Sequence, residues 1–206
     1  MRFDAEHKGQ TRERILKAAA AVVRTKGVDS VGVAEVMADA GLTVGGFYTH
    51  FKNKEDMIAH AIIYAFEERY ARRLDLIADL PPAEALNHFI ADYLSERHLA
   101  NVAHGCPVPA LVSDVSRSDL VVKAGFTQKV DRVITLLGVW LEKMGWPAPY
   151  DTAMSVASEM FGAVSTARAV DDDRRAEAIL AASRRAIRAR LKLETPPAGD
   201  IPSDIH

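Results

Sequence analysis

The sequence is poor in cysteine and has no long hydrophobic run. Its single cysteine, Cys106, cannot form a disulfide within the chain, and one thiol is too few for a cysteine-rich zinc site. No apolar run reaches the roughly 18 residues that a membrane-spanning helix needs. The charged N-terminus, MRFDAEHKGQ, is not followed by an apolar stretch, so we expect no secretory signal peptide. These features favour a protein of the reducing cytoplasm without a membrane partner.

Patterns typical of catalysis and metal binding are also missing. The sequence shows no paired carboxylates, no glycine-rich phosphate loop and no Ser/His/Asp arrangement. His88, His98 and His104 are accompanied by Asp92, but no two of these histidines lie four residues apart on one helix, so their spacing does not favour a metal site. We therefore expect no enzyme, no catalytic residue, no metal and no cofactor.

Helical periodicity dominates the 206 residues, of which 49% are hydrophobic. Glycine and proline fall mostly at the boundaries of the periodic segments, and no convincing strand appears. The pattern predicts nine helices, over residues 11–26, 33–40, 43–50, 54–78, 82–99, 107–115, 118–144, 150–169 and 174–192. We expect an all-α fold, followed by a disordered tail over residues 195–206 because that segment has Pro and Gly but no periodicity.

The first quarter of the chain is more basic than the rest. Residues 1–54 hold nine Lys/Arg against six Asp/Glu, a net charge of +3, whereas the remainder holds 17 against 22, a net charge of −5. A basic head on an acidic body is the asymmetry expected if only the head meets a polyanion, although so small a difference also arises by chance.

Two short helices separated by a glycine turn predict a helix-turn-helix. Gly41 supplies a left-handed residue between them, and Thr43 is expected to cap the second helix. Gly45 then lets the backbone of this helix approach DNA closely, while Phe47 and Phe51 point into the core of the head. Asn53 is expected to cap the next helix. The alternative is an ordinary helical hairpin with Tyr48 and His50 as surface or core residues.

The stretch VAEVMADAGLTVGGFYTHFKNKEDM, residues 33–57, resembles the signature of the TetR family of bacterial transcriptional repressors. The resemblance implies a palindromic double-stranded DNA operator, a homodimer and a small-molecule or electrophile inducer. It also implies that the DNA face consists of Thr43, Val44, Gly45, Tyr48, Thr49, His50 and Lys54. Val44 stands where several members of the family carry a polar or cationic residue, and Gly32 where many carry Ser or Thr.

The resemblance divides the chain into a three-helix DNA-binding head and a larger helical body. We expect the helix-turn-helix DNA-binding domain over residues 1–53 and the ligand-binding and dimerisation domain over residues 54–194. Small residues in 150–169 and an apolar side of 174–192 suit pairing of two copies as a four-helix bundle, or else closure of the monomer's own core. The candidate ligand-binding residues are Phe89, Tyr93, Cys106, Leu111, Phe126, Val130, Trp140 and Phe161, which equally suit plain core.

Cys106 precedes the helix predicted to begin at Pro107. A helix N-terminus favours a thiolate and so raises the reactivity of a thiol, although free cysteine is often a small buried hydrophobe. The Gly-Cys step resembles a branch of TetR-family repressors that sense electrophiles or oxidants through one cysteine. We predict a sequence-specific DNA-binding repressor that is released by an inducer or by thiol modification. The alternative is an inducer-independent DNA-binding structural or cell-division accessory protein.

Overall fold

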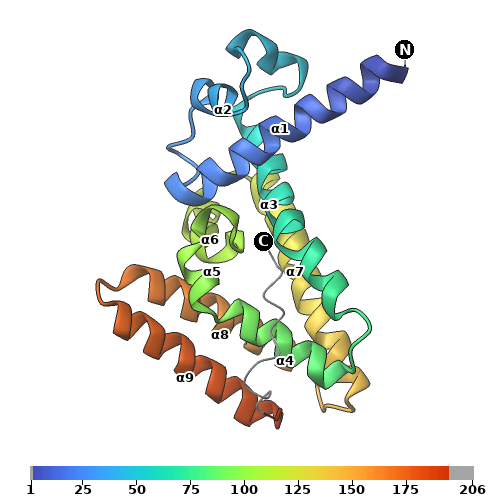
Figure 1. The fold of residues 1–206 in the computed structure, drawn as a ribbon, viewed down its shortest axis with the longest axis vertical. Helices are drawn as coiled ribbons and strands as arrows, with labels where there is room; N and C mark the ends of the chain where they lie inside the picture. The colour runs from blue at the N-terminus through green and yellow to red at the C-terminus, as the bar shows by residue number, and fades with distance from the viewer. Residues whose placement is uncertain (1, 195–206) are drawn as a thin grey trace. The chain divides into compact units, whose positions relative to one another are not determined.

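All regular structure in the described part of the chain is helical, as predicted (Figure 1). The structure is a computed structural model, and it describes residues 2–194 except for the side chains of residues 2–5 and 72. Two short 3-10 helices, η1 (Val44–Thr49) and η2 (Val102–His104), accompany the α-helices. The α-helices are α1 (Arg2–Lys26), α2 (Val33–Asp39), α3 (Lys54–Ile77), α4 (Pro82–Tyr93), α5 (Glu96–Ala100), α6 (Pro107–Arg117), α7 (Leu120–Lys143), α8 (Pro149–Ala169) and α9 (Asp173–Leu191).

The described residues form two compact units. The first unit contains the residues up to Arg72 together with Asn101–Asp131, and the second contains Arg73–Ala100 together with the residues from Arg132 onward. Both α3 and α7 contribute one end to each unit. This division follows the packing of the helices. The boundary expected at residue 53 instead separates a DNA-binding domain from a ligand-binding and dimerisation domain, and it stays a prediction.

The first unit is built around α1, whose buried face includes Ile15, Ala19 and Val23. This face packs on α2, α6 and η2, and α2 in turn packs on η1. The core of the unit is completed by Met37 and by side chains from η1 and α3, since each α-helix has only one apolar stripe to bury. The turns between these short elements thereby acquire a fixed position.

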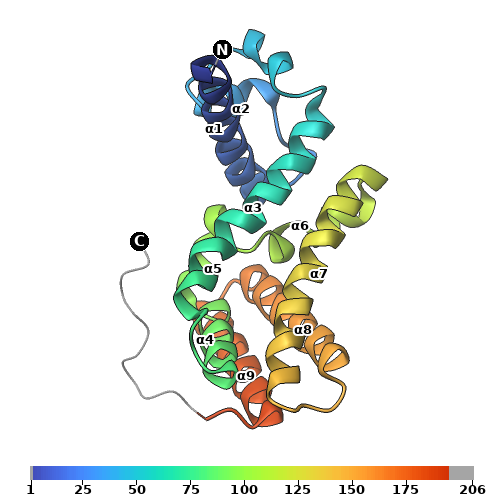
Figure 2. The ribbon, with the colours of Figure 1, turned by 90° about the vertical axis from the view of Figure 1, so that its right-hand side faces the viewer.

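The second unit is a helical assembly around the α8–α9 hairpin. These two helices lie side by side over their length, and α4 packs on α9 while α5 packs on α8 (Figures 1 and 2). Asp172 caps α9, because its side chain accepts hydrogen bonds from the backbone N–H groups of Arg174 and Arg175. Gly138 of α7 is held close to Tyr150, since a Cβ at Gly138 would lie 2.4 Å from that ring.

Three predicted helices differ from the observed ones by more than two residues or in helix type. The first begins at Arg2 rather than Thr11. Good helix formers such as Glu6, Lys8 and Gln10 continue the helix on both sides of Gly9, which is a poor one. The segment 43–50 forms a 3-10 helix rather than an α-helix, and two adjacent glycines in so short a segment weaken α-helix formation.

The expected helix over residues 82–99 is broken at Leu94. The Oγ of Ser95 accepts a hydrogen bond from the backbone N–H of His98 at 3.2 Å and starts α5 anew. The His98 ring also donates from Nδ1 to the Tyr93 carbonyl at 2.7 Å, which holds the break. The predicted disorder of the tail concerns residues 195–206, which lie outside the described residues.

Candidate nucleic-acid interface

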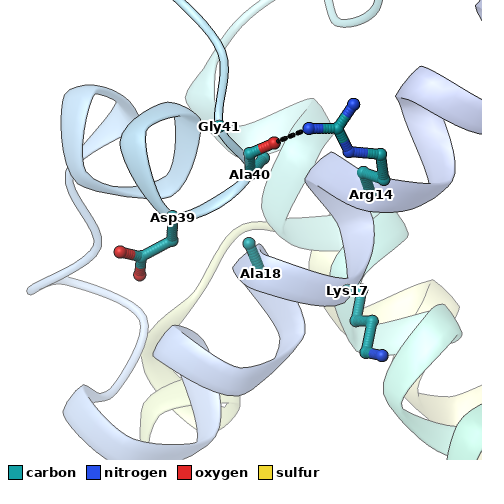
Figure 3. A pocket seen from close by; sticks show the side chains of 6 residues that line it. All are labelled: Arg14, Lys17, Ala18, Asp39, Ala40 and Gly41. Atoms are coloured by element: carbon teal, nitrogen blue, oxygen red, sulfur yellow. Dashed lines mark hydrogen bonds between the residues drawn. The ribbon is translucent and has the colours of Figure 1, made fainter.

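The turn between α2 and η1 has the backbone that the sequence predicts. Gly41 has a φ of +69°, in the left-handed region, and Ala40 is buried where the helices meet. The Leu42 N–H donates to the Met37 carbonyl at 2.8 Å and closes the turn. Arg14 of α1 braces it from outside by donating to the Ala40 carbonyl at 2.5 Å (Figure 3). This role of Arg14 was not predicted, because it depends on a contact between residues 26 positions apart in the chain.

A hollow of about 390 Å³ lies beside this turn, between α1 and α2 (Figure 3). Its polar lining consists of Arg14, Lys17 and Asp39, and Ala18, Ala40 and Gly41 complete the lining. The Arg14 guanidinium already donates a hydrogen bond to the Ala40 carbonyl there. The hollow therefore lies where Arg14 stabilises the turn.

The leading end of η1 presents its residues to solvent. Thr43, Val44 and Gly45 are all exposed, and 48% of the Val44 surface is accessible. Thr43 holds the N-cap position as predicted, but its side chain makes no capping hydrogen bond. Within the part of the chain that the structure describes, a Cβ at Gly45 would meet no atom within 4 Å, whereas a Cβ at Gly46 would lie 3.8 Å from the Met37 methyl group. The protein itself therefore has no packing reason for a glycine at position 45.

The aromatic residues of η1 and of the segment that follows it separate into a buried and an exposed group. Phe47 and Phe51 are buried as predicted, with ring centroids 5.7 Å apart. Tyr48 packs edge-on against Phe47 but keeps 77% of its surface accessible. Thr49 is exposed as well. The buried rings hold η1 to the head and leave Tyr48 free to meet a ligand.

His50 lies half-buried at the end of η1, close to two cations of α1. The Arg12 guanidinium lies 4.9 Å from the centroid of the Phe51 ring, and the rings of Phe51 and His50 are 6.5 Å apart. Burial, and then the positive charges of Lys8 and Arg12, hold the pKa of His50 below its ordinary value. Neither cation was predicted to belong to the DNA face, although their i, i+4 spacing places them on one face of α1.

Lys54 begins α3, and Asn53 caps it as predicted. The Oδ1 of Asn53 accepts from the Asp56 N–H at 2.8 Å. The Lys54 ammonium donates to the Asp29 carbonyl at 3.1 Å, in the loop between α1 and α2. This contact occupies one of the three donors of an ammonium group and fixes the direction of the side chain.

The eight candidate ligand-binding residues fall into two groups. In the second unit, Phe89 stacks on Tyr93 and meets Trp140 edge-on at 5.7 Å, and Tyr93 lies 5.8 Å from Phe161. Those four rings form one aromatic cluster. In the first unit, Cys106 and Leu111 are fully buried, Val130 is half-buried, and Phe126 packs edge-on against Phe66 at 5.8 Å. A ligand-binding role stays a prediction for both groups.

Cys106 occupies the N-cap position of α6, as the sequence predicts, and is completely buried. The Tyr70 hydroxyl donates to its sulfur at 3.2 Å. Arg24, also buried, donates to the carbonyl of the preceding Gly105 at 3.1 Å and pairs with Glu68. Burial lowers the pKa of Arg24, while the hydrogen bond and charge of Glu68 oppose this effect. The thiol therefore lies beside a polar contact between α1 and α3.

None of the helices described in residues 2–194 has the length and apolar character that a membrane crossing requires. In the same part of the chain, no three side chains of His, Cys, Asp and Glu gather as they would around a metal ion.

Sequence comparison matches the head of the chain. A family model described as bacterial regulatory proteins, tetR family, matches residues 15–61, which include α2, η1 and the start of α3. The uncharacterized HTH-type transcriptional regulator YxaF of Bacillus subtilis (strain 168) is 27% identical over 113 residues, or 53% of this chain. That match spans 58% of the length of YxaF, so the chain covers little more than half of this curated relative.

Comparison of structures extends the likeness to most of the chain. The reduced form of NemR from E. coli superposes with a TM-score of 0.76 at 18% identity, covering 87% of this chain and 96% of NemR. A TetR-family transcriptional regulator from Cytophaga hutchinsonii gives a TM-score of 0.76 at 17% identity, covering 89% of this chain and 96% of that protein. At such identities the likeness establishes a shared fold.

Proposed function

The chain belongs to the TetR family of bacterial regulatory proteins, and on that premise we propose that it is a sequence-specific, DNA-binding transcriptional repressor of the cytoplasm. The observation that carries this proposal is the exposed leading end of η1 behind a braced glycine turn. This arrangement suits insertion of η1 into the major groove, where the first residues of the second helix meet base edges.

Few side chains of η1 are placed to read bases. Thr43 offers a hydroxyl, and Val44 offers an apolar surface that suits a thymine methyl group. Gly45 adds no side chain and leaves its backbone open to a close approach. Tyr48, Thr49 and His50 are positioned for phosphates, which orient a protein on the duplex without reading its sequence.

Lys54 contributes to the same backbone contacts in this proposal. Two of its ammonium donors remain after the hydrogen bond to Asp29, and the neighbouring N-terminus of α3 favours an anion. The hydrogen bond to Asp29 already restricts the Lys54 side chain. Less side-chain entropy is therefore lost when it binds a phosphate than for a freely rotating lysine.

A homodimer supplies the second half of the recognition surface. A single short element contacts few base pairs, and dimers on two-fold operators are the usual solution. The outer faces of the α8–α9 hairpin carry small residues that allow close helix approach, namely Ser158, Gly162, Thr166 and Ala169 on α8 and Ala178, Ala182, Ala186 and Ala189 on α9. Gly162 in particular faces open space in the monomer. These stripes support a four-helix bundle between two copies.

Release from DNA in this proposal follows binding of an inducer in the helical body or modification of Cys106. In the second route, the Cys106 sulfur adds to the carbon–carbon double bond of an electrophile, forming one S–C bond while the thiol proton passes to the neighbouring carbon. An adduct cannot fit at a fully buried sulfur, so Tyr70 or the Gly105 segment must move. Arg24 connects that segment to α1, and thus to the head.

The proposal is tested by selecting duplexes from a random pool with the purified chain. We expect a palindromic sequence to emerge, and binding to it to be lost in the combined variant Tyr48→Ala and Lys54→Ala. No enrichment at low salt, where phosphate contacts are strongest, would count against DNA binding altogether.

The release step needs a separate measurement on the selected duplex. N-ethylmaleimide should release wild type but not Cys106→Ser, slowly, because the buried thiol reacts only after local opening. Equal release of both proteins removes Cys106 from the mechanism. Persistence of the complex with every inducer and electrophile favours the alternative, a DNA-binding accessory protein without an inducer.

A further inference from the structure

The N-terminal end of α1 extends beyond the part of the helix that builds the core of the first unit (Figure 1). Residues 6–10 are all exposed, whereas Ile15 is completely buried. Lys8 and Arg12 lie on this extension four residues apart, so their side chains leave the helix about 40° apart around its axis. Both cations therefore share one face.

This face meets the end of η1. Arg12 lies against the ring of Phe51, which fixes its guanidinium beside a residue buried in the head. His50 precedes Phe51, and the two charged groups that act on its imidazole are Lys8 and Arg12. Its Nδ1 atom is buried and has no hydrogen-bond partner among the described residues. Three basic groups from two elements thus converge next to the exposed face of η1.

Convergence of like charges is unfavourable in a free protein and becomes favourable when a polyanion arrives. The adjoining surface of η1, with Thr43, Val44 and Tyr48 exposed, is the proposed entry into the major groove. Duplex DNA carries one negative charge for about every 1.7 Å along its axis, so phosphates border any segment that enters the groove. The positive charge of Lys8, Arg12 and His50 and their position beside η1 therefore both suit binding of duplex DNA.

We infer that the DNA interface extends from η1 onto the N-terminal part of α1, where Lys8, Arg12 and His50 together bind the sugar-phosphate backbone of duplex DNA. The inference rests on the proposed function and adds to it a second element that holds the duplex. Arg12, steadied by Phe51, presents a planar guanidinium that suits two phosphate oxygens, and Lys8 supplies a point charge. These contacts orient η1 and carry no sequence preference.

The test uses the full chain, a duplex selected from a random pool by wild type, and an unrelated duplex of equal length. The variants are Lys8→Gln, Arg12→Gln and the double variant. Lys17→Gln is the matched control, because Lys17 is also exposed on α1 and lies nine residues from Lys8, about 180° around the helix. Thermal unfolding confirms that each variant is folded, which matters most for Arg12 because it also contacts Phe51.

We expect each single variant to bind both duplexes roughly five- to tenfold more weakly at 0.1 M salt, and the slope of log affinity against log salt to fall by about 0.9 per lost phosphate contact. The double variant should lose about 1.8, while Lys17→Gln keeps the slope of wild type. Hydroxyl-radical footprints should show protected sugars that are exposed again in the double variant.

Two outcomes overturn the inference and differ in what they say of the proposed function. If wild type binds the selected duplex and Tyr48→Ala weakens it, but Lys8→Gln and Arg12→Gln keep the wild-type slope, the DNA interface ends at η1. If wild type binds neither duplex at low salt, both the inference and the proposed function fail.

Discussion

At the scale of single residues, Gly45 is a position where we expect a substitution to weaken DNA binding without lowering folding stability. A Cβ at this position meets no atom of the described residues within 4 Å, so Gly45→Ala should leave the free energy of unfolding unchanged or raise it by up to about 1 kcal/mol. If the backbone approaches DNA closely here, the added methyl group should weaken binding by about 1–3 kcal/mol, the usual cost of overpacking a close contact.

The control for this prediction is Gly46→Ala, because a Cβ there contacts Met37 instead of open space. Gly46→Ala should keep the affinity of wild type. Denaturant unfolding and fluorescence anisotropy with a labelled duplex measure the two effects. An unchanged affinity of Gly45→Ala would show that the backbone at position 45 does not lie against DNA.

From the lowered pKa of His50 we predict opposite pH dependences for folding stability and for DNA affinity. Its pKa in the free folded protein is lowered, by burial first and then by Lys8 and Arg12, so the unfolded chain binds the proton more readily. The stability associated with neutral His50 is therefore present above the ordinary histidine pKa of about 6.5 and is lost as the pH falls through the lower folded value. A bound phosphate favours imidazolium, so DNA affinity should rise as the pH falls from about 7.5 to 5.5.

His50→Gln should remove part of both pH dependences. His60 is a second histidine beside Phe51, with ring centroids 6.2 Å apart, and it contacts Asp56, so His60→Gln is the necessary comparison. Urea unfolding and binding isotherms at four pH values provide the data. If His50→Gln follows the wild-type profile in both measurements, protonation of His50 is not linked to either process.

At the scale of elements, the cap of α3 sets the stability of the segment that follows η1. The Asn53 side chain accepts a hydrogen bond from the Asp56 N–H, so Asn53→Ala should lower the free energy of unfolding by about 1 kcal/mol. Asn101 holds the N-cap position of η2 without a side-chain hydrogen bond, and Asn101→Ala should cost much less. Equal losses in the two variants, measured by urea unfolding, would show that the cap is not the source of the effect.

Helix boundaries that depend on local chemistry were predictable from the sequence. Gly41 has a positive φ as predicted, and Asn53 caps the helix that begins at Lys54. The break at Leu94 was not predicted, because it depends on hydrogen bonds of Ser95 and His98 inside a segment whose apolar spacing continues unbroken. Similarly, the spacing of apolar residues gave no sign that α1 begins at Arg2, since residues 6–10 are all exposed.

At the scale of the whole molecule, the helix-turn-helix and its buried rings followed from one contiguous stretch, because every signal lay within about 25 residues of sequence. Contacts between distant segments did not follow. The hydrogen bond from Arg14 to Ala40, the hydrogen bond from Lys54 to Asp29 and the contact of Arg12 with Phe51 each join positions 25 or more residues apart. Such contacts depend on packing, which periodicity and capping motifs do not specify.

Dimerisation is the prediction that belongs to the complete chain. Gly162 faces open space in the monomer, so Gly162→Glu should leave each copy folded, since glutamate is also the better helix former. In a two-fold interface over α8, the substitution brings two carboxylates and extra bulk to the same contact. We expect the dimer to dissociate at micromolar concentration and operator affinity to fall sharply, because one copy holds only half of the site.

Ala83→Glu is the matched control for Gly162→Glu. Ala83 is exposed on α4, and its substitution adds the same charge, so any general repulsion of DNA is equal in the two variants. Sedimentation velocity gives the oligomeric state and anisotropy the affinity. A Gly162→Glu protein that stays dimeric would place the interface away from the small-residue stripe of α8. A monomer that keeps wild-type affinity would instead show that each copy binds DNA by itself.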